Sequence, residues 1–281
     1  MGGGGNILVV VWAMLCVGEP DRYVWCATSK TLEDWFMAVK RVVDLVFLVD
    51  VTGSMSPCIE GLKASIKQFF AHLTDESANA CAIRDWRAKV VGYRDAAFDA
   101  EQWLVDQPFV RTSEEIHAQL DALVAKGGGD EPESLLDALL TVADMGEMGL
   151  QDREDPAKWR ARGMAARVVV VFTDATYHPE ATVEKYAGCG YQDVARKLGE
   201  QRVILEVITP VSPADKSVPQ ETFEQAYEAL ASADKAEYCP LRTEDCVAFP
   251  FSEIGAHMEL FEQFVAQLAK TLSATVAPPE L

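Results

Sequence analysis

Short apolar runs alternate with amphipathic stretches along most of the chain. The runs at 42–49 and 168–173 are almost wholly apolar, which predicts strands buried on both faces of a sheet. Apolar residues recur at helical spacing over 58–73 and again over 254–276. Strands that alternate with helices predict an α/β fold with a doubly wound, mostly parallel sheet that is flanked by helices.

The rest of the chain continues this alternation, and no internal repeat or Ser/Pro-rich linker divides it. We therefore expect residues 31–276 to form one domain, followed by a short tail over 277–281. The further elements that the pattern predicts are strands at 86–93, 101–110, 203–208 and 247–251, and helices at 32–39, 112–126, 132–142, 193–200 and 221–233.

An apolar run at 7–17 precedes this domain. Its eleven residues are too few to span a bilayer as a helix, no Lys or Arg precedes it, and the segment 18–21 does not resemble a signal-peptide cleavage site. With a second β-rich segment at 23–26, it predicts an N-terminal β-hairpin extension over residues 1–30. The hairpin strands either extend the sheet of this chain or pair with another chain, and the sequence leaves both open.

The charge and the cysteine content limit which classes of binding partner and which cellular compartment we expect. The 281 residues carry a formal net charge of −19, which repels nucleic-acid backbones and anionic membranes, so neither is expected as a direct partner. The seven cysteines are scattered and form no C-x-x-C pair, which favours structural thiols in a reduced, cytoplasmic protein over a zinc site.

Acidic residues stand where buried strands are predicted to end. Asp50 ends the first run and begins a D-x-T-x-S sequence with Thr52 and Ser54, while Asp174 directly follows the run at 168–173. Asp130 lies in the sequence GGGDEPE, just before a predicted helix. Because the carboxyl ends of parallel strands meet at one edge of a sheet, these oxygens are expected to converge. Carboxylate and hydroxyl ligands suit one divalent cation, with Mg²⁺ expected first and Mn²⁺ or Ca²⁺ as alternatives.

Four more polar residues are expected behind these ligands or on the loops around them, namely Ser56, Asp95, Glu131 and His178. Each assignment has an alternative. Asp95 fits an ordinary surface turn equally well, and His178 fits an exposed loop position. Asp130 fits the cap of the helix that begins near Pro132.

The sequence blocks VDLVFLVDVTGSM, VGYRD, GGGDEPE and VVVVFTDATYH occur in this order along the chain. Together they resemble von Willebrand factor A domains with a metal-ion-dependent adhesion site, and most of all the A-type domains associated with alpha-kinases and their bacterial relatives. The resemblance covers about residues 42–276 and implies a Rossmann-like fold. It also implies a six-coordinate metal bound directly by Thr52 and Ser54, and directly or through water by Asp50 and Asp174, with one position open for a partner carboxylate.

This chain departs from the adhesion-type pattern at Asp130, where that pattern supplies a threonine. Three carboxylates around a divalent ion leave roughly one excess negative charge, so we expect tighter metal binding and weaker attraction for a partner carboxylate. The resemblance implies binding rather than catalysis. We therefore expect a metal-dependent protein–protein interaction module, an adaptor or scaffold subunit of a multi-subunit intracellular complex. The alternative is a metal-assisted hydrolase with Asp130 or His178 as the general base.

Overall fold

The computed structural model describes residues 9–16, 23–30, 41–75, 83–127, 131–210, 214–231, 236–240 and 251–276. Three of the features predicted above lie outside these residues: the helix at 32–39, the tail at 277–281 and the candidate ligand Asp130.

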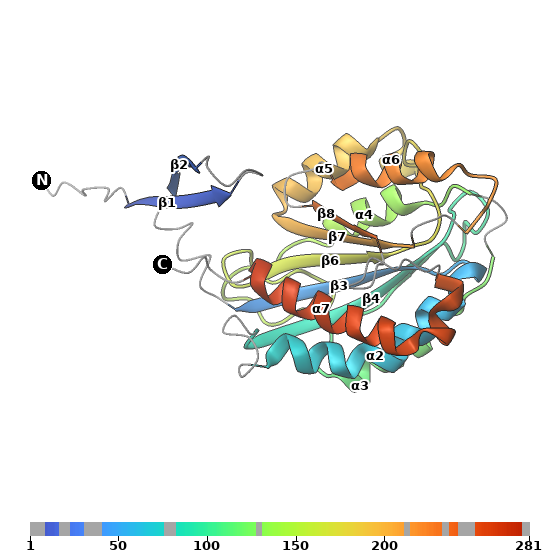
Figure 1. The fold of residues 1–281 in the computed structure, drawn as a ribbon, viewed down its shortest axis with the longest axis horizontal. Helices are drawn as coiled ribbons and strands as arrows, with labels where there is room; N and C mark the ends of the chain where they lie inside the picture. Colours follow the sequence, from blue (N-terminus) through green and yellow to red (C-terminus); the bar gives the residue numbers. More distant parts are fainter. Residues whose placement is uncertain are drawn as a thin grey trace, which may run out of the picture.

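A six-stranded sheet forms the centre of the molecule, with the strand order β5-β4-β3-β6-β7-β8 (Figure 1). Every neighbouring pair is parallel except β4 and β5, which are antiparallel at one edge. This arrangement confirms the predicted α/β, doubly wound, mostly parallel sheet. The strands are β3 (Val42–Asp50), β4 (Asp85–Tyr93), β5 (Leu104–Asp106), β6 (Ala166–Phe172), β7 (Val203–Thr209) and β8 (Ala236–Pro240).

Helices cover both faces of this sheet (Figure 1). One face carries α2 (Ser56–Thr74), α3 (Ser113–Asp121) and α7 (Met258–Val276), and the other carries α4 (Leu135–Ala143), α5 (Tyr191–Glu200) and α6 (Gln220–Ala231). The described residues also contain three short 3-10 helices, η1 (Gly53–Met55), η2 (Glu184–Tyr186) and η3 (Phe251–Ala256).

Strand β3 shows why its apolar run is continuous. Phe47 and Val49 belong to the core under α2 and α7, while Val46 and Leu48 belong to the core under α4 and α5. Successive side chains of a strand point to opposite faces, so a strand with a core on each face needs apolar residues at almost every position. This strand places its last residue, Asp50, at the edge of the sheet where the parallel strands end.

Several predicted boundaries were wrong. The expected strand at 101–110 is reduced to β5, because only Leu104–Asp106 pair with β4 and Val110 forms an isolated bridge with Ala88. Helix α3 stops before residue 126, because the backbone that follows it bonds to other segments: Lys126 N–H donates to the carbonyl of Val51 at 3.0 Å.

The C-terminal part also differs from the expectation. Phe251 does not end a strand but begins η3, where it is buried with Ile254, and the rest of the expected strand, 247–250, lies outside the described residues. The last strand of the sheet is instead β8, which the pattern did not predict. Helix α7 consequently begins at Met258 rather than at residue 254.

The N-terminal extension contains two paired strands. β1 (Val9–Cys16) and β2 (Tyr23–Lys30) are antiparallel, with Val9 opposite Lys30 and Cys16 opposite Tyr23. They form a two-stranded sheet of their own, so the predicted hairpin is present and does not add strands to the six-stranded sheet.

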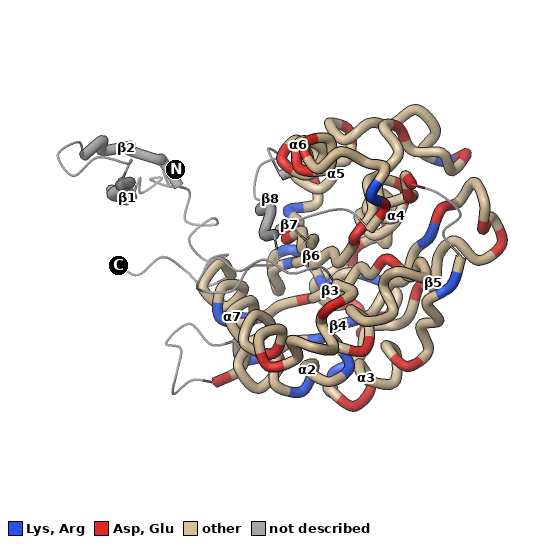
Figure 2. Tube along the Cα trace, turned by 45° about the vertical axis from the view of Figure 1, so that its right-hand side comes forward, with Lys and Arg blue, Asp and Glu red and all other residues tan. Residues whose placement is uncertain are grey.

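Acidic positions occur on helices of both faces, including α3 and α6 (Figure 2). The negative charge is therefore spread over the molecule and is not confined to one edge of the sheet. In the part of the chain that the structure describes, no helix has the length and apolar character needed to cross a membrane.

Candidate metal centre

Asp50, the last residue of β3, is fully buried and held by two threonines. Its Oδ1 accepts hydrogen bonds from the Thr52 backbone N–H at 2.9 Å and from the Thr52 hydroxyl at 2.7 Å. Its Oδ2 accepts a hydrogen bond from the Thr173 hydroxyl at 2.9 Å. Burial raises the pKa of Asp50 although these bonds lower it. The carboxylate is therefore fixed in place by neutral donors.

Asp174 approaches the same place from the loop after β6. The Ser54 hydroxyl donates to Asp174 Oδ1 at 3.0 Å, and Ser54 Oγ lies 3.4 Å from Thr52 Oγ1. Asp174 is buried, and burial first and the charge of Asp50 second raise its pKa to about 7. The structure thus brings together four of the five predicted ligands, Asp50, Thr52, Ser54 and Asp174.

This set fits a divalent cation. A serine or threonine hydroxyl has one proton to donate and two lone pairs. Thr52 and Ser54 donate to Asp50 and Asp174 respectively, so their lone pairs remain available to a cation. Among the described residues, no three His, Cys, Asp or Glu side chains form a metal-binding group by themselves. The two hydroxyls are therefore essential to the donor set, which is entirely oxygen and suits Mg²⁺, Mn²⁺ or Ca²⁺.

The loop that carries Asp130 is anchored on its amino-terminal side. Gly127 has a positive φ of 76°, and a Cβ there would lie 2.8 Å from Asp99 Oδ2, so this position favours glycine on both counts. Its carbonyl accepts a hydrogen bond from Gly53 N–H at 3.3 Å, which ties the loop to the turn after β3. Asp130 itself is outside the described residues, so its role as a ligand stays a prediction.

On its other side, the loop is tied to the segment after β6. Glu133 N–H donates to the Thr176 carbonyl at 2.9 Å, and His178 N–H donates to the Glu133 carbonyl at 3.1 Å. Glu131 Oε2 lies 3.4 Å from the Thr176 hydroxyl, and burial raises the pKa of Glu131. Both ends of the loop therefore lie against the two segments that carry the described ligands.

Asp95 and His178 lie together behind this loop. Asp95 Oδ1 accepts from Ala97 N–H at 2.9 Å and from the Ser134 hydroxyl at 3.2 Å, and it lies 3.1 Å from His178 Nε2. Asp95 is buried, and the His178 side chain is 20% exposed. Neither is therefore the ordinary exposed turn or loop residue that the alternative interpretation allowed.

Among the predicted site residues that the structure describes, Ser56 lies apart from this group. It is exposed at the first position of α2, and no hydrogen bond joins its hydroxyl to the described carboxylates. Ser56 is therefore a suitable control residue for Ser54, because the two serines are close in sequence and only Ser54 bonds to a described carboxylate of the site.

Sequence reasoning missed several residues that shape the site. Thr173 bonds to Asp50, and its position directly before Asp174 was a usable signal. Arg94 was visible in VGYRD, and its guanidinium donates to the carbonyls of Gln102 at 2.8 Å, Val124 at 2.6 Å and Lys126 at 3.0 Å. These bonds hold the backbone leading into the loop of Asp130.

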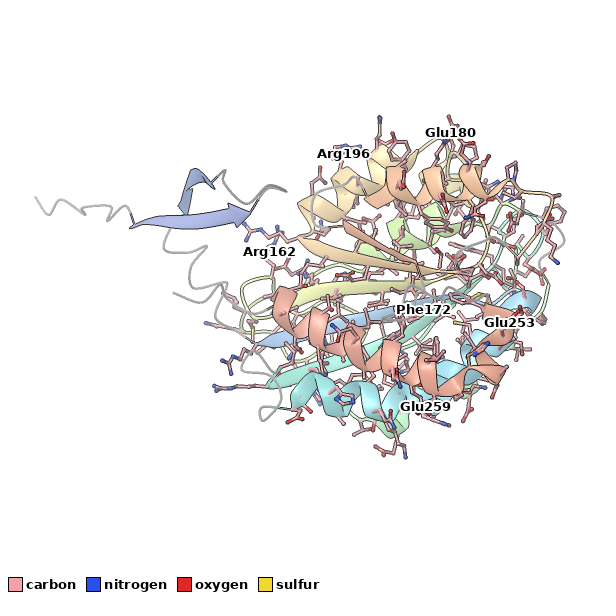
Figure 3. All side chains as sticks on the ribbon, in the orientation of Figure 1. Arg162, Phe172, Glu180, Arg196, Glu253 and Glu259 are labelled. Carbon is pink, nitrogen blue, oxygen red and sulfur yellow. The ribbon has the colours of Figure 1, made fainter. Side chains whose placement is uncertain are left out.

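A cavity of about 630 Å³ opens beside Ser54 and Asp174. Its other walls include Lys216, between β7 and α6, and Phe251 and Glu253 of η3. Figure 3 shows Glu253 near the end of the sheet at which the parallel strands finish, with Arg162 at the opposite end. The volume is in the range of ligand pockets, so there is room for part of a binding partner next to the candidate ligands.

Comparisons with known proteins give the family. Residues 44–246 match the model of the von Willebrand factor type A domain. The structure is similar to that of the pilus adhesin SpaC from Lactobacillus rhamnosus GG, with a TM-score of 0.54 and 12% identity over 85% of this chain and 31% of the adhesin. The open conformation of SpaC gives a TM-score of 0.53 and 11% identity over 85% of this chain and 30% of the adhesin.

A search of curated proteins found no match. The chain spans less than a third of the adhesin, and at such low identity the likeness shows the fold alone. The family model, by contrast, covers most of the chain and includes the strand ends that carry Asp50 and Asp174. This chain therefore belongs to the von Willebrand factor type A domain family.

Proposed function

We propose that this chain is a metal-dependent protein-interaction module that binds one divalent cation, Mg²⁺ first and Mn²⁺ or Ca²⁺ as alternatives. The observation that carries the proposal is the hydrogen-bonded group of two buried carboxylates and two hydroxyls at the carboxyl ends of β3 and β6. Thr52, Ser54, Asp50 and Asp174 would hold the ion, and Asp130 would join them.

A bound cation would supply positive charge at the mouth of the cavity beside Ser54 and Asp174. The chain's own residues fix the loops around that point: Thr173 orients Asp50, and Arg94 holds the backbone before Gly127. Because up to three carboxylates face the ion, its attraction for a partner carboxylate is weakened. We therefore propose that the cation mainly orders the loops and that the partner contacts the loops themselves.

The proposed partner is another protein. Members of this family often serve in protein interaction or adhesion, and the two SpaC structures compared above are of a pilus adhesin. The sequence blocks resemble A-type domains associated with alpha-kinases and their bacterial relatives, which supports an adaptor or scaffold role in a cytoplasmic multi-subunit complex. The net charge of −19 favours a partner whose contact surface is not strongly acidic.

The test is the thermal midpoint of metal-stripped protein with added Mg²⁺, Mn²⁺ or Ca²⁺. A ligand that binds only the native state stabilises it by about 2.7 kcal/mol at one hundred times its dissociation constant, which is a rise of about 2–4 °C per kcal/mol for a domain of this size. We expect this rise in the wild type and in Ser56→Ala, and a much smaller one in Ser54→Ala. A wild type that responds to none of the three ions would contradict the proposal.

The hydrolase alternative gains no support of its own from the geometry. His178, one of its two candidate bases, has Nε2 within 3.1 Å of Asp95 Oδ1 and is not among the residues that line the cavity. The other candidate base, Asp130, is outside the described residues. Binding is therefore the function that we propose.

A further inference from the structure

Glu133 is a buried acid that lacks a partner for one of its oxygens. The side chain is 2% exposed, and its Oε2 has no hydrogen-bond donor among the described residues. Asp95 is buried to the same extent, and its Oδ2 also lacks a donor there. A buried carboxylate without a donor or a positive neighbour is costly, so its presence calls for a physical reason.

The same part of the chain satisfies a neighbouring buried acid completely. Asp137 lies four residues after Glu133 and is fully buried. Its Oδ1 accepts from the N–H groups of Thr182 at 3.0 Å and Val183 at 2.8 Å, and its Oδ2 lies 3.1 Å from Thr182 N. Asp137 thus accepts hydrogen bonds at both of its oxygens, as expected of a carboxylate with a structural role. Glu133 Oε2 has no such donor among the described residues.

The surroundings of Glu133 are acidic. Burial first, and then the charges of Asp50, Asp95, Asp99 and Asp174, raise the pKa of Glu133 to about 8. Two of these carboxylates, Asp50 and Asp174, belong to the candidate metal centre. The backbone of Glu133 is meanwhile fixed by its bonds to Thr176 and His178, so the side chain is held among these charges.

We propose that Glu133 is a further protein group of the metal centre, whose free carboxylate oxygen faces the bound cation and its water shell. The inference rests on the proposed function and adds a residue outside the five ligands assigned above. A divalent cation removes the repulsion between Glu133 and the neighbouring carboxylates, and water bound to it supplies the donors that the protein does not.

This role has an unusual consequence for stability. Without metal, burial of Glu133 among other acids destabilises the fold, either through charge repulsion or through the cost of protonating the carboxylate. With metal, its charge strengthens binding. A purely structural glutamate would have the opposite signature, because its removal would lower the stability of the metal-free protein.

The experiment compares Glu133→Gln with the wild type by calorimetric titration of Mg²⁺ and by thermal unfolding of the metal-free protein. We expect the affinity for Mg²⁺ to fall about ten- to a hundredfold, as for other groups around a metal. We expect the metal-free midpoint to stay the same or to rise. Glu133→Asp, which keeps the charge, should retain more affinity than Glu133→Gln.

Asp137→Asn is the matched control, because it neutralises a buried acid next to Glu133 that the fold already satisfies. It should lower the metal-free midpoint and keep the Mg²⁺ affinity. If the wild type binds Mg²⁺ and Glu133→Gln binds it equally well, or if Glu133→Gln lowers the metal-free midpoint as Asp137→Asn does, the inference is overturned and the proposed function stands. A wild type that binds none of Mg²⁺, Mn²⁺ and Ca²⁺ overturns both.

Discussion

Strand β3 carries a fully buried aspartate near each end, and the two aspartates accept hydrogen bonds from different kinds of donor. Near the amino end, Asp44 accepts hydrogen bonds from Arg87 at 2.9 and 2.8 Å and from the Arg160 side chain at 2.6 Å. At the carboxyl end, Asp50 accepts from the neutral groups of Thr52 and Thr173. Among the described residues, the aspartate at one end of the strand accepts hydrogen bonds from two guanidinium groups, and the aspartate at the other end accepts them from hydroxyls and a backbone amide.

The contrast extends to the two ends of the parallel strands, which we call the amino edge and the carboxyl edge of the sheet. At the amino edge, Arg160 also pairs with Asp85 at 2.5 Å, and Arg167 pairs with Glu147 at 2.9 Å. At the carboxyl edge, Asp50 and Asp174 raise the pKa of Glu133, and the Arg94 guanidinium is occupied by backbone carbonyls. Figure 3 labels a residue near each of these edges, Arg162 and Glu253.

The difference shows which buried acids serve the fold alone. A buried carboxylate is tolerated when charged or strongly donating groups surround it, and the planar guanidinium of arginine does this with two bonds at once. Asp44 receives that compensation from the chain itself. Asp50 and Asp174 accept hydrogen bonds from neutral hydroxyls and an amide instead, so their oxygens remain suited to a cation from solution. Substitutions at both edges test whether the two edges differ in this way.

The largest effect is expected from Asp44→Ala. It leaves Arg87 and Arg160 buried without their shared partner, and breaking a buried ion pair in this way costs about 3–5 kcal/mol. Urea unfolding measures this loss, which should be the same with and without saturating Mg²⁺. A loss that depended on Mg²⁺ would show that the two edges are not independent.

Asp50→Asn should have the next largest effect, and only when metal is present. The amide keeps an acceptor for Thr52 but removes one of the two buried negative charges that we assign to the cation. The stabilisation by Mg²⁺, about 2.7 kcal/mol at one hundred times the wild-type dissociation constant, should be largely lost. The metal-free variant should unfold at a urea concentration close to that of the wild type, and a large loss there would assign Asp50 a structural role like that of Asp44.

The sequence was sufficient for the parts of the fold with strong periodicity. The apolar runs of β3 and β6 and the stripe of α2 are long and bounded by clear polar residues, so their positions were predicted closely. Strand β8 is short and contains a glutamate, Glu237, and it was missed. The short apolar run ending at Phe251 was read as a strand, because periodicity cannot separate a short strand from a single helical turn.

The candidate site likewise contains some residues that the sequence predicted and others that it did not. Asp50 and Asp174 were predictable because they end apolar runs, and the topology of a parallel sheet brings such ends together. The environment of Glu133 was not predictable from the sequence, because it depends on charges supplied by β3 and by the loops after β4 and β6. Asp44 was visible as a polar residue inside an apolar run, but its partner Arg160 lies 116 residues away and only the folded chain identifies it.

A smaller effect is expected from Trp159→Phe at the amino edge. Trp159 is fully buried, and its indole N–H donates to the Val142 carbonyl at 3.0 Å. Loss of this bond leaves the Val142 carbonyl with the longer bond from Met145 N–H at 3.4 Å, so we expect a cost of about 1 kcal/mol in the free energy of unfolding. Trp103→Phe, at a partly buried position, is the control and should cost less. Equal losses in the two variants would mean that the hydrogen bond of Trp159 adds nothing.

Arg162→Ala should have the smallest effect, although Arg162 belongs to the same edge as Arg160 and Arg167. Its side chain is 44% exposed, and its bond to Glu147 at 3.1 Å duplicates the one that buried Arg167 makes. Solvent and salt screen an exposed pair, so we expect a loss of about 0–1 kcal/mol in urea unfolding, and less at high salt. A loss as large as that of Asp44→Ala would show that exposed arginines at the amino edge stabilise its carboxylates as much as the buried ones do. A small loss would place this stabilisation in the buried guanidinium groups that donate to Asp44, whereas Asp50 accepts its hydrogen bonds from Thr52 and Thr173.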